Sequence, residues 1–254
     1  MNRDTETKEY RFNEAKHLHE ILVENEWKAL TGCTTVLSVL AKPALIQWSA
    51  NEAVKYAIEH AVDKGVEDGI PYYYINADTL EEAKTAHRKK KEKAGEAGTD
   101  VHNEVQKLVM GQIERNNGMF SGNEVHENPQ VQHFINWAVQ NKVKFLETEK
   151  GVYSRSYFIG GILDLIVEMD GELWIADIKT GSGIYPEHFA QMAGYEIMMS
   201  EMGYPPLKGS IVLNLKKTGE FEEKRSVSNE DAKELFLACL KIYRLQEKFK
   251  NQII

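Results

Sequence analysis

The segment YFIGGILDLIVEMDGELWIADIK, which runs from Tyr157 to Lys179, contains two apolar runs separated by Asp170-Gly171. An Asp-Gly pair between two such runs predicts a two-residue type I′ turn, because both central positions of that turn need positive φ. The sequence therefore predicts a β-hairpin with strands at 156–169 and 172–180.

The short turn also fixes which residues of the hairpin face each other. With Met169 opposite Glu172, counting back along both strands brings Asp164 opposite Asp177, with Cβ atoms about 5 Å apart. Lys179 lies two residues beyond Asp177 and so points to the same face. Because like charges directly opposite destabilise a sheet, the pair requires compensation, and a divalent cation supplies it. The pattern therefore predicts a catalytic metal site with Lys179 beside it.

The alternative interpretation is an exposed hairpin face that carries three ordinary surface charges, and it predicts polar surroundings. Apolar side chains instead occupy both faces of the predicted hairpin. They are Ile162, Ile166 and Ile175 on the face of the aspartates, and Leu165, Val167, Trp174, Ala176 and Ile178 on the other. A strand pair that is apolar on both faces belongs inside a covered sheet, where charge is costly unless it is paired or used. We therefore prefer the functional interpretation.

Four short motifs follow one another along the chain. They are Gly98-Thr99-Asp100-Val101-His102, Gly160-Gly161-Ile162-Leu163-Asp164, Asp177-Ile178-Lys179 and Gln191-Met192-Ala193-Gly194-Tyr195. The second and third resemble the core of the PD-(D/E)XK nuclease superfamily. The first and last are similar to the Gly-Thr-x-x-His and Gln-x-x-x-Tyr motifs of its RecB-type exonuclease branch. Leu163 stands where the signature has proline, but this branch commonly has a glycine-rich lead there.

A weaker likeness lies upstream, at Thr31-Gly32-Cys33-Thr34-Thr35-Val36-Leu37, which resembles a segment of phage-type and mitochondrial genome-maintenance exonucleases. The resemblance as a whole implies an α/β fold with a restriction-endonuclease-like core, a mixed central sheet flanked by helices, and a helical N-terminal region. We expect a single nuclease domain over 1–254, with a mainly helical part at 1–97 and the core at 98–254.

The resemblance also implies a ligand set and roles for the site residues. The metal ligands would be His102, Asp164, Asp177 and the backbone carbonyl of Ile178. Imidazole beside two carboxylates suits Mg²⁺ or Mn²⁺, with water completing the shell. Lys179 would position the attacking water or stabilise developing charge. Taken alone, a histidine in this position is more often an ordinary surface residue.

Gln191 and Tyr195 are four residues apart and so share one face of a predicted helix. In relatives that helix borders the site, and its Gln and Tyr orient the lysine or contact DNA; an ordinary helix surface pair is the alternative. Glu147 and Glu149 precede the hairpin on a strand. Either could be an outer acidic residue of the site, or both could belong to a solvated strand edge.

The stretch from Lys84 to Lys93 holds six Lys or Arg residues and one Glu. It ends just before Gly98-Thr99, so we predict that it contacts nucleic-acid phosphates. The predicted contact residues are Arg88, Lys89, Lys90, Lys91 and Lys93. The alternative is a solvated helix face, which is what such runs usually are. The net charge of −8 argues against nucleic acid wrapped over the whole surface.

Composition narrows the class of protein. A chain of 254 residues with 42% hydrophobic residues can bury the core of one large domain. Apolar runs fall short of the roughly 18 residues of a membrane span, and the first residues lack a signal-peptide pattern. Two cysteines cannot supply the four thiolates of an iron–sulfur cluster. We expect no such cluster, and a cytoplasmic location.

Hydrophobic periodicity and turn residues predict the remaining elements. Helices are expected at 34–40, 44–62, 79–94, 100–112, 129–141, 186–202 and 229–250. Strands are expected at 17–30, 143–153, 208–216 and 220–227, with a loop at 65–78.

These features predict a Mg²⁺- or Mn²⁺-dependent DNA nuclease, an exonuclease by resemblance, that hydrolyses phosphodiester bonds at single-stranded or duplex ends. Phage-type recombination, replication or repair is the context that the resemblance implies, with a single-strand annealing or recombination protein as a possible partner. Two alternatives stay open. One is a catalytically silent subunit that binds DNA ends, and the other is a nucleotide phosphoesterase.

Overall fold

The computed structural model describes residues 8–67, 69–250 and 252. The chain divides into two compact units, one made of residues 1–40 and 101–254 and the other of residues 41–100. The strands are β1 (Tyr10–Asn13), β2 (Leu18–Val23), β3 (Glu26–Gly32), β4 (Val62–Glu67), β5 (Ile70–Tyr74), β6 (Lys144–Ser154), β7 (Ile159–Met169), β8 (Glu172–Lys179), β9 (Gly209–Leu215) and β10 (Phe221–Ser226). The helices are α1 (Cys33–Val36), the short 3-10 helix η1 (Leu37–Val39), α2 (Pro43–Glu59), α3 (Ala77–Arg115), α4 (Pro129–Gln140), α5 (Pro186–Glu201) and α6 (Glu230–Lys250).

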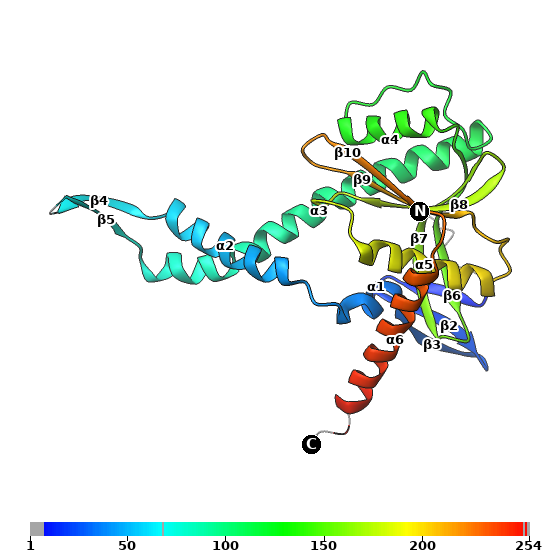
Figure 1. Cartoon of the computed structure of the whole chain (residues 1–254), viewed down its shortest axis with the longest axis horizontal. Helices are drawn as coiled ribbons and strands as arrows, with labels where there is room; N and C mark the ends of the chain where they lie inside the picture. Colours follow the sequence, from blue (N-terminus) through cyan, green and yellow to red (C-terminus); the bar gives the residue numbers. More distant parts are fainter. Residues whose placement is uncertain (1–7, 68, 251, 253–254) are drawn as a thin grey trace. The chain divides into compact units, whose positions relative to one another are not determined.

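The first unit is built on a mixed sheet with the order β1-β2-β3-β7-β8-β9-β10, in which β6 also pairs with β7 (Figure 1). The predicted hairpin lies at its centre. Met169 opposes Glu172 and Leu165 opposes Ala176, so the predicted register is confirmed. Asp170 and Gly171 both have positive φ, 52° and 77°, as a type I′ turn requires. Beyond the hairpin, α5 connects β8 to β9, which is parallel to it.

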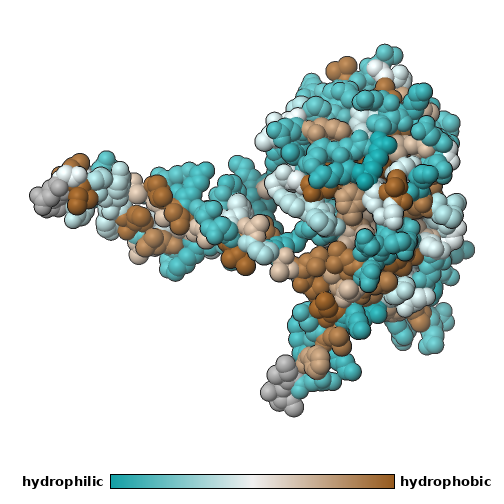
Figure 2. Space-filling model, in the orientation of Figure 1, coloured by the Kyte–Doolittle hydropathy of each residue, from teal (hydrophilic) through white to brown (hydrophobic). Residues whose placement is uncertain are grey.

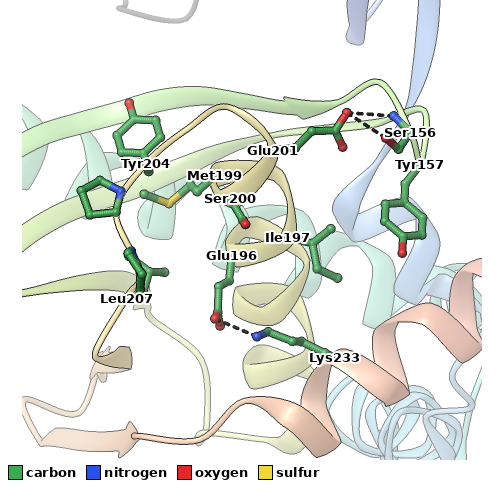
Figure 3. Close-up of a pocket in the computed structure, with 12 residues that line it drawn as sticks. Ser156, Tyr157, Glu196, Ile197, Met199, Ser200, Glu201, Tyr204, Leu207 and Lys233 are labelled. Carbon is green, nitrogen blue, oxygen red and sulfur yellow. Dashed lines mark hydrogen bonds and ion pairs between the residues drawn. The ribbon is translucent and has the colours of Figure 1, made fainter.

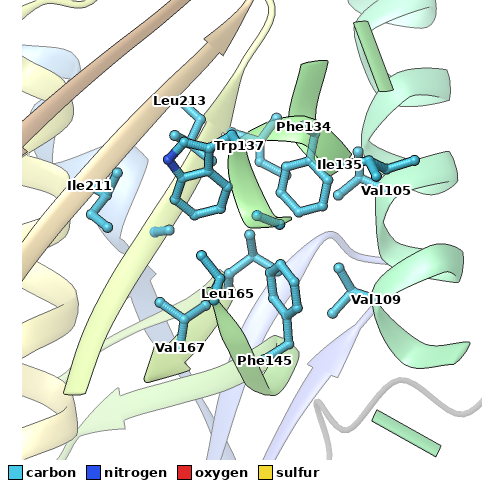
Figure 4. Packing of buried hydrophobic residues seen from close by; sticks show 14 of the residues in the cluster. Val105, Val109, Phe134, Ile135, Trp137, Phe145, Leu165, Val167, Ile211 and Leu213 are labelled. Carbon is cyan, nitrogen blue, oxygen red and sulfur yellow. The ribbon is translucent and has the colours of Figure 1, made fainter. Parts of the chain in front are cut away.

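Helices cover this sheet on both faces. On one face, α4 and the C-terminal part of α3 pack against β6 to β9, and Figure 4 shows Phe134 and Trp137 of α4 meeting Leu165 and Val167 of β7. On the other face, α1, α5 and α6 pack against the same strands. The face assignment made from the sequence is confirmed for the clustered residues. Leu165, Val167, Trp174, Ala176 and Ile178 lie in the first core, and Ile166 and Ile175 lie in the second.

One edge of β7 is shared by two different strands. Strand β6 pairs along the length of β7 and so occupies its other edge. At the start of β7, β3 pairs in parallel through Ile159 and Gly160. At its end, β8 pairs from Leu165 onward. Residues 161–164 therefore form a gap between the two ladders on that edge, and Asp164 is the last residue of the gap.

The alternation of β7 also breaks at Asp164. Leu163 packs in the core beneath α5, whereas Leu165 packs in the core beneath α4. Residues two apart in a regular strand point to the same face, so the pleat is interrupted between them. The interruption lies at Asp164, between a side chain that packs under α5 and one that packs under α4.

The N-terminal part of the chain, expected to be mainly helical, also supplies strands. The strand expected at 17–30 is split into β2 and β3 by a tight turn, in which Glu24 and Asn25 have φ of 51° and 68°. Asn tolerates this left-handed conformation, so Asn25 favours a turn inside the expected strand. Strand β1 adds to β2 as a further antiparallel partner.

Two expectations for residues 65–112 are wrong. The loop expected at 65–78 contains most of the β4–β5 hairpin, because β-branched and aromatic residues there favour extended backbone on either side of a turn in which Gly69 has φ of 80°. The two helices expected at 79–94 and 100–112 are one continuous helix, α3. Thr99, which lies between the two expected helices, donates its hydroxyl to the carbonyl of Gly95 within that helix.

The second unit contains α2, β4, β5 and the first part of α3. Within it, Glu52 pairs with Lys90 at 2.7 Å, Tyr56 donates a hydrogen bond to Glu82, and Trp48 meets His87 edge-on. Burial is sparse: of residues 41–100, only Ala83 and Gly98 are buried among those whose side chains are described. Figure 2 shows hydrophobic residues along the surface of this unit. Exposed large hydrophobic side chains of the unit include Ile46, Val54, Ile58, Val66 and Ile70.

No helix in the described part of the chain is both long enough and apolar enough to cross a membrane.

Candidate active site

Asp164 lies where the β7–β8 ladder stops. The next pair in register would be Asp164 with Asp177, but the ladder ends at Leu165 and Ala176. In its place, Oδ2 of Asp164 accepts a hydrogen bond from the backbone N–H of Ile178 at 2.8 Å. The carbonyl of Asp164 in turn accepts the hydroxyl of Thr148 on β6 at 3.0 Å. Asp164 is thus held by both neighbouring strands, and a side chain takes over a bond that the backbone would otherwise make.

Asp177 is the most deeply buried carboxylate among the predicted site residues, with its side chain 3% exposed. Its Oδ2 forms an ion pair with Nζ of Lys179 at 2.5 Å. Burial raises the pKa of Asp177 above the ordinary value, Lys179 opposes the rise, and the neighbouring charge of Asp164 adds to it. For Lys179, burial alone would lower the pKa, but the carboxylates of Asp177 and Asp164 outweigh it and raise the pKa. The two aspartates and the lysine therefore form one electrostatic unit.

His102 comes to this site from α3. Its Nδ1 lies 3.7 Å from Oδ2 of Asp164, which is too long for a hydrogen bond. Two ligand atoms that each lie about 2.1 Å from an octahedral cation are separated by roughly 3 to 4 Å. The spacing therefore suits two ligands of one ion. With Glu149, these side chains offer one ligand atom each within 4.8 Å of one another.

The donor set agrees with a hard divalent cation. An imidazole nitrogen and carboxylate oxygens suit Mn²⁺ or Mg²⁺, and the negative charge clustered here leaves the site in need of a cation. The residues that could hold one are His102, Glu149, Asp164 and Asp177. In the described structure, the side chains of this site fit such an ion.

Gln191 and Tyr195 lie on the face of α5 that is directed at the site. Oε1 of Gln191 lies 3.5 Å from Nζ of Lys179, and Nε2 of Gln191 donates to the hydroxyl of Tyr195 at 2.8 Å. The amide therefore connects a buried tyrosine to the lysine. The surface-pair alternative does not fit Tyr195, which is 3% exposed.

The two glycines before Asp164 are explained by close approaches on both sides of β7. A Cβ atom on Gly161 would lie 2.5 Å from Cε1 of Tyr195, and one on Gly160 would lie 2.9 Å from Cβ of His19. Distances below 3.0 Å are essentially never seen for real Cβ atoms. Glycine at these positions therefore lets α5 and β2 reach the gap in the sheet.

The segment Thr31–Leu37 contacts the same region. Sγ of Cys33 lies 3.5 Å from the carbonyl oxygen of Gln191. A Cβ atom on Gly194 would lie 2.8 Å from that sulfur. The segment singled out upstream in the sequence thus packs directly behind α5.

The basic residues predicted to contact phosphates lie on α3 within the 41–100 unit. Lys90 is engaged with Glu52. Arg88, Lys89, Lys91 and Lys93 are exposed, and none of the four has an ion pair within 4 Å among the described residues. The sequence prediction treated these five residues as equivalent. In the structure Lys90 differs from the other four, because Glu52 already neutralises its charge.

A cavity of about 590 Å³ lies elsewhere on the first unit (Figure 3). Glu196 and Glu201 of α5 line it, but Glu196 pairs with Lys233 at 2.8 Å and Glu201 accepts the backbone N–H groups of Arg155 and Ser156. None of the predicted site residues lines this cavity. Its acidic groups are used in holding α5 to α6 and to the turn after β6.

Comparison with known proteins identifies the family. The family model of the PD-(D/E)XK nuclease superfamily matches residues 77–252, which is well over half of the chain. The chain therefore belongs to the PD-(D/E)XK nuclease superfamily, whose members are metal-dependent nucleases. No curated protein sequence matches it.

A solved structure described as the crystal structure of SSO0001 is 16% identical, with a TM-score of 0.28. The match covers 44% of this chain and 57% of that chain, so the chain spans a little over half the length of that protein.

The structure thus brings together six predicted residues where the β7–β8 ladder ends. They are His102, Asp164, Asp177, Lys179, Gln191 and Tyr195. The sequence does not distinguish Glu147 from Glu149 as a candidate site residue, and the structure separates them. Glu149 joins the cluster with His102, whereas Glu147 is bound by Tyr204 and Lys150. The sequence could not make this choice, because it depends on the positive backbone φ of Glu149.

Proposed function

We propose that this protein is a Mg²⁺- or Mn²⁺-dependent DNA exonuclease that hydrolyses phosphodiester bonds at DNA ends. The observation that carries the proposal is the arrangement at the end of the hairpin. Asp164, Asp177 and Lys179 converge with His102 within a superfamily of metal-dependent nucleases. An ion-paired lysine next to two carboxylates argues against a silent subunit, which would have no need to keep this costly cluster intact.

Each of these side chains has a separate role in the proposed reaction. His102, Asp164 and Asp177, with the backbone carbonyl of Ile178, would hold the cation. The bound cation would polarise the scissile phosphate and lower the pKa of a water molecule. Lys179 lies 2.5 Å from Asp177, where its charge can stabilise the charge that develops on the phosphate. The side-chain oxygen of Gln191 orients the amine of Lys179. The hydroxyl of Tyr195 accepts a hydrogen bond from Gln191 and holds its amide in place.

The DNA backbone would be bound by Arg88, Lys89, Lys91 and Lys93, which carry exposed positive charge. A mononucleotide needs no such track, so the run supports a polymer over a nucleotide substrate. Phage-type recombination, replication or repair, with a single-strand annealing protein as partner, is the setting that we infer from the sequence motifs.

The test compares four substrates with the purified protein in Mg²⁺ and in Mn²⁺. They are linear single-stranded DNA, blunt linear duplex, closed circular single-stranded DNA and a mononucleotide phosphodiester. An exonuclease degrades the linear DNA and spares the circle. The Asp164→Asn variant, which keeps the size of the side chain, controls for contaminating nuclease.

Each alternative has its own outcome. Cleavage of the circle would make the protein an endonuclease. Hydrolysis of the mononucleotide substrate alone would make it a nucleotide phosphoesterase. Binding of DNA ends without cleavage in either metal would assign it as a silent end-binding subunit.

A further inference from the structure

Helix α2 has apolar residues on two sides. On one side, Trp48, Glu52 and Tyr56 contact side chains of α3. The other side carries an exposed stripe that consists of Ile46, Ala50, Val54 and Ile58. Residues four apart on an α-helix are offset by only about 40°, so the exposed stripe stays on one face for about three turns. A helix that is apolar on opposite sides is normally buried on both.

The exposed stripe has no cover within the described chain. Ile46, Val54 and Ile58 are 74%, 59% and 67% exposed. Strands β4 and β5 form a two-stranded sheet of their own and add further exposed side chains, among them Val66 and Ile70. Such a sheet is only marginally stable in water unless something packs against it. The 41–100 unit therefore presents apolar surface that a second surface should cover.

The residues that flank the exposed stripe are polar but neutral. Gln47 and Asn51 lie beside it, and Nε2 of Gln47 donates a hydrogen bond to Oδ1 of Asn51 at 2.9 Å. Nucleic acid is bound mainly through cations that neutralise its phosphates, and neither residue supplies one. The centre of a homodimer interface, in contrast, is apolar and depleted in charge. The chemistry of this face therefore fits an equally apolar and neutral protein surface, which the same face of a second copy provides.

The available area is also sufficient for a dimer. Among the large hydrophobic side chains exposed in the described chain, eleven belong to residues 41–100, and each is between 48% and 74% exposed. Together they present on the order of 1,000 Å² of surface, whereas a stable complex of standard size uses about 800 Å² from each partner. With the polar residues that flank them, two copies that meet here can bury enough area to stay associated.

We propose that two copies of this chain associate through their 41–100 units, with the exposed stripe of one α2 packed against the exposed stripe of the other. A two-fold axis brings the same patch of both copies together, so a single apolar stripe can cover its own counterpart. The inference concerns assembly and does not depend on the proposed nuclease function.

The experiment measures the mass of the full-length protein by light scattering after size-exclusion chromatography, without DNA or metal. At about 50 µM the wild type should have twice the mass of the 29.0 kDa chain, because interfaces of this size have dissociation constants in the micromolar range or below. Val54→Lys combined with Ile58→Lys should weaken association at least about 100-fold, since like charges that face each other across an interface oppose it. Both positions are exposed in one copy, so the variant should keep the far-ultraviolet circular dichroism of wild type.

Val125→Lys combined with Val227→Lys is the matched control. These valines are 90% and 70% exposed and lie in the other unit. The control therefore replaces two exposed apolar side chains and adds the same charge as the α2 variant, but it leaves the exposed stripe intact. It should remain a dimer at the same concentration.

Cysteine crosslinking locates the contact independently of these charge changes. A single cysteine replaces, in turn, each residue of the exposed stripe, and the native Cys33 and Cys239 are buried and should not react. Under mild oxidation at least one of these variants should form a disulfide-linked dimer, because the same residue of both copies meets near a two-fold axis. Glu59→Cys, at an exposed position on the other side of α2, should stay uncrosslinked.

Three results would overturn the proposal. One is a monomeric wild type, and another is a dimer that survives the combined Val54→Lys and Ile58→Lys changes. The third is crosslinking of Glu59→Cys but of no variant in the exposed stripe, which would assign association to another surface. If wild type is monomeric and the Val54→Lys/Ile58→Lys variant binds DNA more weakly despite its added positive charge, DNA covers this face instead.

Discussion

The carboxylate of Asp164 is tied to the backbone N–H of Ile178 by a hydrogen bond of 2.8 Å. This bond joins two neighbouring strands at the first position where their ladder is missing. Because Ile178 lies between Asp177 and Lys179, the same contact positions the segment that carries both of them. One side chain thus sets the spacing between the two halves of the proposed metal site.

Removing the charge of Asp177 should abolish DNA cleavage without unfolding the protein. In Asp177→Asn, the loss of repulsion with Asp164 and the loss of the ion pair with Lys179 oppose each other. We expect cleavage to fall at least 1000-fold, on the order of the loss of a major electrostatic contribution. The thermal midpoint in metal-free buffer should stay within a few degrees of wild type, about 1 kcal/mol. Activity close to wild type would mean that Asp177 is not part of the site.

Replacing Lys179 should separate turnover from metal binding. Lys179→Ala removes the positive charge next to Asp177 but no oxygen or nitrogen ligand. We expect the turnover number to fall about 100-fold or more, while calorimetric Mn²⁺ affinity is kept or increased. Lost Mn²⁺ binding in this variant would assign Lys179 a structural role.

The basic residues of α3 should control the salt dependence of DNA binding. Changing Arg88, Lys89, Lys91 and Lys93 to Gln should weaken binding to all DNA sequences alike. The slope of log K against log[salt] should become less steep by up to about 0.7 for each phosphate of single-stranded DNA that the variant no longer neutralises. Lys90→Gln is the internal control, since Lys90 is paired with Glu52 and should change the slope little. If the variant with all four substitutions keeps the wild-type slope, these residues form an ordinary solvated helix face and do not contact DNA.

His19 should make the stability depend on pH. Burial and the nearby His17 lower its pKa from 6.5 to about 4, and its Nδ1 lies 2.7 Å from the Tyr10 hydroxyl, which donates to the carbonyl of Gly161. The unfolded chain takes up a proton at higher pH than the folded one. The contribution of neutral His19 is therefore fully present above pH 6.5 and is lost as pH falls towards 4, at most about 3 kcal/mol.

The measurement is urea unfolding of wild type and His19→Gln at several pH values between 7 and 4. The variant should lose most of the decline that wild type shows over this range. His17→Gln, in which the neighbouring charge alone is removed, should retain most of it. An identical pH profile for wild type and His19→Gln would contradict the assignment.

The sequence predicted the hairpin, its register and its two faces because turn chemistry and alternation are local signals. Asp170-Gly171 sets a register that holds for every pair down to Leu165 and Ala176. The break at Asp164 could not be predicted, since it depends on β3 and β8 sharing one edge of β7. The same non-local arrangement turns Glu149 towards His102, which lies far away in the sequence.

The glycine pair Gly160-Gly161 shows the same difference between what the local sequence predicts and what depends on the fold. In the sequence, Gly160-Gly161 stands out only as part of a motif. The physical reason needs the fold, because the atoms that exclude a Cβ belong to Tyr195 and His19. Likewise, the sequence predicted separate helices at 79–94 and 100–112, yet α3 is continuous through residues 95–99.

Helix α3 joins two regions of very different burial. From Val101 onward, Val101, Val105 and Val109 are packed in the core of the first unit. Before it, residues 77–100 bury only Ala83 and Gly98, and Gly95 and Gly98 each lower helix stability by about 1 kcal/mol relative to alanine. Local opening needs little free energy where it exposes little buried apolar surface. Amide protons of residues 79–94 should therefore exchange with solvent far faster than those of residues 105–112, so that a single helix belongs to two cooperative folding units.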